Sequence, residues 1–133
     1  CQTDHRIRII HQVNSGVAAA RNRGISESRG KYIAFLDHDD LYLPDKLAVL
    51  KSLLDETPNA VLAYSPVIPF GEDISRFIKF GIVDYLTYHQ LLQHNLIYSM
   101  SCVMVKKEPV ERHNIRFDNV CAPCDDWDFY LQL

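Results

Sequence analysis

The sequence predicts an α/β fold in which helices cover the faces of a mainly parallel sheet. Two observations lead to this class. Apolar runs at residues 6–12, 31–37 and 60–66 have the density of buried strands, and segments with helical patterns separate them. The order strand, helix, strand, helix, strand is typical of parallel sheets with helical layers. In such sheets a ligand site lies beyond the carboxyl ends of the strands.

Length and composition indicate one globular domain over residues 1–133. Of its 133 residues 47% are hydrophobic, which is enough for a substantial core. The net charge is −3 and no Lys/Arg run is present, so we expect no nucleic acid partner. No apolar stretch approaches the length of a membrane span. The four cysteines do not indicate a disulfide framework in a domain of this size, so we expect a cytoplasmic protein.

The first helix is expected between the strands at 6–12 and 31–37. Asn14 or Ser15 can cap its start, and three consecutive alanines favour a helix after them. Gly30 is well placed to end it. A helix in this position would connect two neighbouring strands of the sheet.

The clearest amphipathic helix covers residues 44–58. Pro44 lies in its first turn, and Leu47, Leu50 and Leu54 recur on one face. Beyond the strand at 60–66 we expect an irregular loop, a helix, a fourth strand and a final helix, at residues 67–82, 84–95, 101–107 and 125–133 respectively.

Three carboxylates follow the apolar strand at 31–37. Asp37, Asp39 and Asp40 lie within four residues, so their repulsion would raise at least one pKa in the absence of a cation. A divalent metal removes this cost, and oxygen-only ligands suit Mg²⁺ or Mn²⁺. Those ions usually accompany a phosphate-bearing substrate. The alternative is a solvated acidic turn that stabilises the N-terminus of the following helix.

The segment N-S-G-V-A-A-A-R-N-R-G at residues 14–24 precedes K-Y-I-A-F-L-D-H-D-D at residues 31–40. Together they resemble the family 2 glycosyltransferases, which have the GT-A fold, an Asn-x-Gly-x-x-x-Ala-Arg-Asn-x-Gly helix start and a later strand ending in Asp-x-Asp. The matching positions are Asn14, Gly16, Ala20, Arg21, Asn22, Gly24, Asp37 and Asp39. The likeness continues through "LLQHNLIYSMSCVMVKKEPVE" and "IRFDNVCAPCDDWDFYLQL" and is weakest over residues 66–84.

The resemblance implies a metal-dependent transfer of a sugar from a nucleoside diphosphate donor, with a UDP-sugar expected. Asp37 would face the nucleotide and Asp39 would bind Mg²⁺ or Mn²⁺. Asp40 would assist either role and is assigned with Asp39 to the metal.

The helix start would lie on the donor side of the same site. Arg21, Asn14 and Gly16 would lie near the donor, where a guanidinium can pair with diphosphate oxygens. The alternatives are a surface charge for Arg21 and a simple helix cap for Asn14.

The catalytic base of the family is the Asp of a Glu-Asp-Trp-Asp motif. Asp126 matches this base, and Asp125 replaces the Glu. Asp126 would take the proton from an acceptor hydroxyl, whose oxygen would attack the anomeric carbon in one inverting displacement. The alternative is that both residues only form the acidic first turn of the last helix. Trp127 could flank the acceptor sugar, although its residue type favours the core.

The chain aligns with the family after its first nucleotide-binding strands, so we expect a partial GT-A domain. The implied acceptor is a glycan or a lipid-linked acceptor, and many relatives assemble cell-surface polysaccharides at the inner face of a membrane. A catalytically inactive fragment or binding module is the alternative function. An incomplete sheet would also favour self-association, because its apolar edge would be exposed.

Other enzyme classes remain as alternatives. Cys121 and Cys124 form a Cys-x-x-Cys before the last helix, a pattern of thiol redox sites, but the adjacent Asp125 and Asp126 disfavour a thiolate. A zinc site would need His113 and a fourth ligand that the spacing does not supply. A phosphatase of the haloacid dehalogenase type also has Asp-x-Asp after an apolar strand, but the residues that follow here do not fit that pattern.

Overall fold

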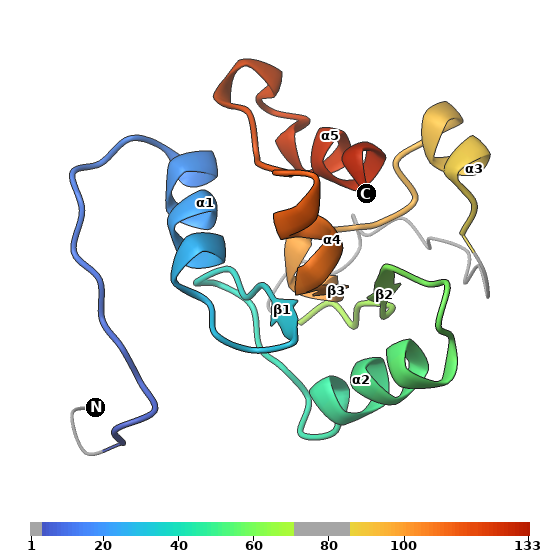
Figure 1. Cartoon of the computed structure of the whole chain (residues 1–133), viewed down its shortest axis with the longest axis horizontal. Helices are drawn as coiled ribbons and strands as arrows, with labels where there is room; N and C mark the ends of the chain where they lie inside the picture. Colours follow the sequence, from blue (N-terminus) through green and yellow to red (C-terminus); the bar gives the residue numbers. More distant parts are fainter. Residues whose placement is uncertain (1–3, 71–85) are drawn as a thin grey trace.

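The computed structural model describes residues 4–70 and 86–133, which form a small sheet with helices on both faces (Figure 1). The sheet contains β1 (Tyr32–Ala34), β2 (Leu62–Tyr64) and β3 (Val103–Lys106) in the order β1-β3-β2. The α/β class predicted from the sequence is therefore confirmed.

The pairing of the described strands differs from the parallel arrangement that we predicted. β3 lies between β1 and β2 and is antiparallel to both. The predicted order does hold for β1, the helix after it and β2, which run in the same direction. The connection through this helix leaves room for one strand between β1 and β2. β3, which comes later in the chain, occupies this position in the antiparallel direction.

The strand residues alternate between two cores, as the period of two of a pleated strand requires. Val103 and Val105 face one core and Met104 faces the other. The register carries this alternation across the sheet, because Ile33 and Leu62 both pair with Val105. Its central position explains why β3 is the most buried of the three described strands.

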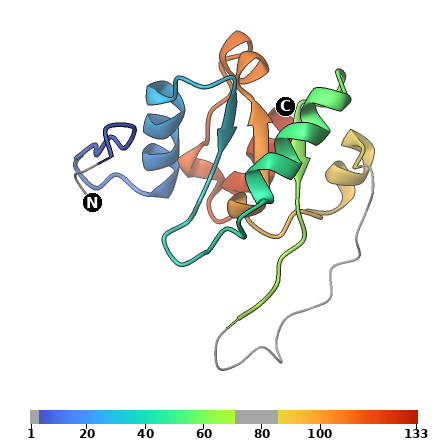
Figure 2. The ribbon, with the colours of Figure 1, turned by 90° about the horizontal axis from the view of Figure 1, so that it is seen from below.

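The helices divide between these two faces (Figure 2). Only α2 (Lys46–Glu56) packs on the Met104 face in the part of the chain that the structure describes, through Leu50 and Leu54. The other face is covered by α1, α3, α4 and α5, which span Val17–Glu27, Tyr88–Gln93, Lys107–Arg112 and Asp125–Gln132. Two 3-10 turns, η1 (Met100–Cys102) and η2 (Asn119–Cys121), precede β3 and α5. The larger core lies under these four helices.

The start of α1 differs from the prediction in its capping residue. The N-cap is Gly16, whose φ of 88° is in the left-handed region that glycine tolerates best. Asn14 accepts a hydrogen bond from the Gly16 N–H at 3.2 Å and thus shapes the turn before the cap. Gly30 also lies beyond the end of α1, because Ser28 is its C-cap.

Two adjacent lysines at the end of β3 hold the ends of the first two long helices. Lys107 Nζ donates to the carbonyl of Ser28 at 2.7 Å, at the end of α1. Lys106 Nζ donates to the carbonyl of Pro58 at 2.8 Å, just after α2. Cations at these positions bind carbonyl groups just beyond the helix C-termini, where a positive charge is favourable. The sequence analysis missed α4, which begins at Lys107 where we predicted the end of a strand.

Residues 6–12, predicted as a buried strand, are irregular and exposed in the structure. Ile7 and Ile9 are 56% and 64% exposed, and the segment runs outside α1 (Figure 1). An apolar run forms a strand only where a neighbouring strand completes its hydrogen bonds. The described sheet places no strand beside this segment, so the prediction was wrong.

The predicted loop at 67–82 is described only at residues 67–70, which carry no regular element, and its remainder lies outside the described residues. The predicted helix at 84–95 is present as the shorter α3, which Thr87 and Gln90 begin with a capping box. Within residues 4–70 and 86–133, no helix has the length and apolar character needed to cross a membrane.

Candidate functional site

A pocket of about 410 Å³ opens where the start of α1, the end of β1 and the start of α5 meet. This volume is within the usual range of small-molecule sites. It is lined by Val17 and Arg21 of α1, Asp37, residues 98–100, residues 122–123, and Asp125 and Asp126 of α5. The structure thus brings together three residues predicted for the site, Arg21, Asp37 and Asp126.

Arg21 joins the two acidic parts of the pocket. Its Nη2 lies 3.2 Å from Asp37 Oδ1, and its Nη1 lies 3.2 Å from Asp125 Oδ2. The guanidinium also lies over the ring of Phe117, 5.4 Å from the ring centroid. The Arg21 side chain is only 16% exposed, so the interpretation of Arg21 as a surface charge was wrong.

The neighbouring Asn22 fixes the segment that leads toward α5. Its side-chain amide donates to the Phe117 carbonyl at 2.8 Å and accepts from the Phe117 N–H at 2.9 Å. Because an amide side chain can both donate and accept, Asn22 satisfies both backbone groups of Phe117, as a neighbouring strand would. Arg21 and Asn22 therefore hold the first and last thirds of the chain together.

Asp37 is held by a residue that the sequence analysis missed. The Asp37 N–H donates to Ser101 Oγ at 2.9 Å, and Lys46 Nζ donates to the Ser101 carbonyl at 2.6 Å. Through these two hydrogen bonds the buried Ser101 fixes both ends of the loop between β1 and α2. The available signal was a hydroxyl within an otherwise apolar run ahead of β3.

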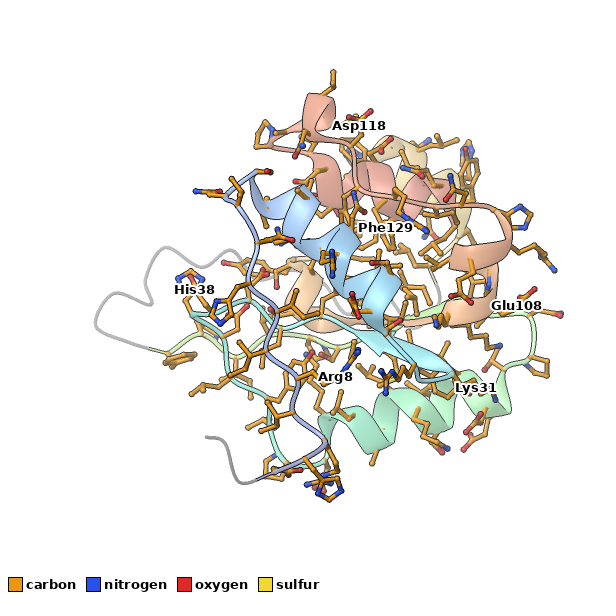
Figure 3. The ribbon with its side chains drawn as sticks, turned by 60° about the vertical axis from the view of Figure 1, so that its left-hand side comes forward. Arg8, Lys31, His38, Glu108, Asp118 and Phe129 are labelled. Carbon is orange, nitrogen blue, oxygen red and sulfur yellow. The ribbon has the colours of Figure 1, made fainter. Side chains whose placement is uncertain are left out.

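The other two acids of that loop do not line the pocket. Asp39 is exposed and Asp40 is partly buried. Figure 3 shows His38, which precedes Asp39, at the outer edge of the molecule. The structure places no cluster of three or more His, Cys, Asp or Glu side chains with metal-ligand geometry among residues 4–70 and 86–133. Mg²⁺ and Mn²⁺ nevertheless fit a pair of carboxylates, because Mg²⁺ sites commonly combine one or two carboxylates with water and substrate phosphates.

The two remaining donor-side residues predicted from the sequence also lie outside the pocket lining. The Asn14 side chain is exposed and bonded to the backbone of Gly16. Gly16 is next to Val17, which does line the pocket. The structure thus brings these two residues to the margin of the site.

The start of α5 supplies the two carboxylates on the other side. Asp125 is buried, and Asp126 accepts the Trp127 N–H at 2.7 Å. Burial is the largest influence on Asp126 and raises its pKa, with a smaller rise from Asp125. The Trp127 N–H and the charge of Arg21 act in the opposite direction. A carboxylate with a raised pKa in a pocket is a stronger base for proton transfer.

Trp127 itself is used in packing. Its Nε1–H donates to the Leu91 carbonyl at 2.6 Å, which ties α5 to α3. The ring is partly buried and is not part of the pocket lining. This arrangement agrees with the core interpretation of Trp127.

The cysteines of the Cys-x-x-Cys motif are free thiols. Desolvation raises the pKa of Cys121, and the charges of Asp128, Asp118 and Asp125 raise it further. Because the thiolate is the reactive form, these surroundings disfavour a thiol redox site.

Comparison with known proteins supplies the class of this chain. Residues 1–113 match the family described as glycosyl transferase family 2. The chain therefore belongs to glycosyl transferase family 2, whose fold is GT-A. No solved structure gives a significant match.

Curated relatives of the chain include several bacterial proteins. One is "Putative teichuronic acid biosynthesis glycosyltransferase TuaG" of Bacillus subtilis, 33% identical over 85% of this chain and 46% of that protein. An uncharacterised glycosyltransferase of Haemophilus influenzae is 26% identical over 94% of this chain and 43% of its own length. Another, from Rickettsia felis, is 52% identical over 42% of this chain and 9% of that protein. The chain thus spans less than half the length of these relatives.

Proposed function

We propose that this chain is part of a GT-A domain that transfers a sugar from a nucleoside diphosphate sugar, most simply a UDP-sugar, to a hydroxyl of a glycan or lipid-linked glycan. The observation that carries the proposal is the double ion pair of Arg21 with Asp37 and Asp125. These two ion pairs bring the segment after β1 and the start of α5 to one pocket, which Asp126 also lines.

Asp37, Asn14, Gly16 and Arg21 form the donor side in this proposal. Arg21 already pairs with two carboxylates, so its main contribution is to hold them in place and balance their charge. Asp39 and Asp40 would hold Mg²⁺ or Mn²⁺, which when bound offsets negative charge on the leaving diphosphate. The exposed position of Asp39 leaves coordination sites for phosphate oxygens.

Asp126 is the general base in this proposal. Its carboxylate takes the proton of the acceptor hydroxyl while that oxygen forms a bond to the anomeric carbon. The bond from the anomeric carbon to the diphosphate oxygen breaks in the same step, and the nucleoside diphosphate leaves with the electron pair. Attack from the opposite face inverts the configuration.

The proposal is tested by calorimetric titration of UDP into the chain with and without Mn²⁺. We expect binding that requires Mn²⁺ and that Asp39→Asn removes, because the variant loses one anionic ligand. Asp45→Asn is the matched control, since Asp45 is an exposed aspartate further along the same loop. Its binding should equal that of the unchanged chain.

Transfer is then measured in the complete protein that contains the chain. Asp126→Asn should retain UDP binding and lower the transfer rate by about 10²–10⁴-fold, the usual contribution of a general base. Full transfer activity in this variant would refute the assignment of the base. A folded chain that binds no UDP, within a complete protein without transfer activity, would favour the inactive binding module.

A further inference from the structure

Two polar atoms in the interior have no hydrogen-bond partner within the described part of the chain, Arg21 Nε and the Tyr130 hydroxyl. Tyr130 is 2% exposed, and both atoms are shielded from solvent. Buried polar groups in native proteins are nearly always satisfied, so each exception calls for a physical explanation. The sequence does not reveal that either atom is buried without a partner.

Both atoms belong to the surroundings of the pocket. Tyr130 follows Asp126 by four residues on α5, so their side chains lie on the same helical face. Arg21 extends from α1 to the same region and pairs with Asp125, next to Asp126. Arg21 and Tyr130 therefore both lie near the side chain that we propose as the base.

The charged and titratable groups around this point come from four elements. The Tyr130 hydroxyl interacts with Asp126 on its own helix, Cys102 of η1, Arg21 of α1 and Asp37 after β1. Asp126 in turn interacts with Asp125 and Arg21. Burial raises the pKa of Tyr130 far above its ordinary value, so the phenol stays protonated and can donate a hydrogen bond.

The hydrogen-bonding capacities of these groups are complementary. Arg21 Nε has one N–H to donate, a tyrosine hydroxyl can accept one bond and donate another, and an ionised carboxylate only accepts. A chain from Arg21 Nε–H to the Tyr130 oxygen, and from the Tyr130 O–H to Asp126, would satisfy all three groups. A single buried water can complete such a chain where two groups do not touch.

We propose that Tyr130 is a positioning residue for Asp126, to which its hydroxyl donates a hydrogen bond while accepting one from Arg21 Nε, each through a buried water. This inference rests on the proposed role of Asp126 as the base. A hydrogen bond to the ionised form favours that form. Tyr130 thus counteracts the burial of Asp126 and keeps the carboxylate ionised and oriented toward the acceptor.

The test is Tyr130→Phe in the complete protein, which removes only the hydroxyl. We expect the acidic limb of kcat/KM against pH to move upward by about one pH unit, because Asp126 loses a donor to its ionised form. We expect kcat to fall about tenfold with little change in the KM of the donor. The urea midpoint of unfolding should also fall, because the substitution leaves Arg21 Nε and Asp126 without the hydroxyl that the proposal assigns to them.

Tyr32→Phe is the matched control. The Tyr32 hydroxyl donates to Asp55 of α2 on the opposite face of the sheet. We expect this variant to lower the urea midpoint and to leave the pH profile unchanged. The two tyrosines should therefore differ in the pH profile, which only Tyr130→Phe shifts.

An unshifted pH profile in Tyr130→Phe, together with loss of transfer in Asp126→Asn, would overturn the role of Tyr130 alone. If Asp126→Asn kept full transfer activity, the proposed base would fail, and the role of Tyr130 would fail with it. A fall in the urea midpoint of Tyr130→Phe without a pH shift would assign the hydroxyl a structural role and also overturn the proposal.

Discussion

Two stretches of the chain have the same local composition and very different surroundings. Residues 37–40 and residues 125–128 each contain three aspartates within four positions. The first stretch lies on the loop after β1, where Asp39 is exposed. The second forms the start of α5, where Asp125 is buried. Arg21 pairs with the first aspartate of each.

The difference between the stretches shows how tertiary structure assigns roles to identical side chains. The second stretch lies at a helix N-terminus, where exposed backbone N–H groups favour negative charge. The first is fixed to Ser101 only through Asp37, and its later acids have no such support. The second stretch is therefore formed by the fold itself. The first would be completed by a cation and a ligand.

The largest effect should come from Arg21→Met, which removes the cation that both stretches share. The Asp125 side chain is 9% exposed and would be left without its partner. Leaving one charge of a buried pair unpaired costs about 3 to 5 kcal/mol. We expect the free energy of unfolding, measured with urea, to fall by this amount.

Arg23→Met is the control for Arg21→Met on the same helix. Arg23 pairs with Glu27 at 2.7 Å, but its side chain is 52% exposed. Exposed pairs of this kind contribute about 0.5 kcal/mol. If both variants lost equal stability, Arg21 would not be the link between the two stretches.

The second prediction compares the stability that is lost when each carboxylate partner of Arg21 is replaced. Asp125→Asn keeps the shape of a buried side chain and removes its charge, so we expect a loss of about 2 kcal/mol. Asp37→Asn does the same at a side chain that is 33% exposed. There we expect about 0.5 kcal/mol, because solvent screens the pair. Urea unfolding of both variants measures the difference, and a larger loss for Asp37→Asn would reverse the comparison.

The local sequence pattern was sufficient to predict elements that are buried by packing against a single neighbouring element. The leucine spacing predicted α2, and Leu50 and Leu54 are its buried residues, whereas Leu47 is 43% exposed. The apolar run at residues 6–12 looked equally convincing, but its burial needs a neighbouring strand that the described fold does not place there. The antiparallel entry of β3 was likewise invisible, because strand order depends on distant pairing.

The sequence motifs predicted which residues belong to the site, but they did not predict the contacts between those residues. The motifs led to Arg21, Asp37 and Asp126, which the structure gathers in one pocket. The bond of Asp37 to Ser101 joins residues 64 positions apart, and the pair of Arg21 with Asp125 joins residues 104 apart. No spacing rule reaches over such distances, so these supports became visible only in the structure.

The smallest of the three effects concerns Asp126 and has the opposite sign. Burial raises the pKa of Asp126 in the folded chain, so ionisation of this carboxyl opposes folding. Its favourable contribution is present below the unfolded pKa of about 4 and is lost as pH rises through the folded pKa. Asp126→Asn cannot ionise, so the variant should become more stable than the unchanged chain as pH rises from 4 to 7.

Urea unfolding of both proteins at pH 4 and pH 7 measures this gain. A variant that is less stable at pH 7 would mean that the Trp127 N–H and Arg21 outweigh burial at Asp126. The expected result separates the neighbours within one stretch. Asp125 would stabilise the fold, whereas Asp126 would weaken it. A group that weakens the fold is retained where its chemistry is needed, as is common in active sites.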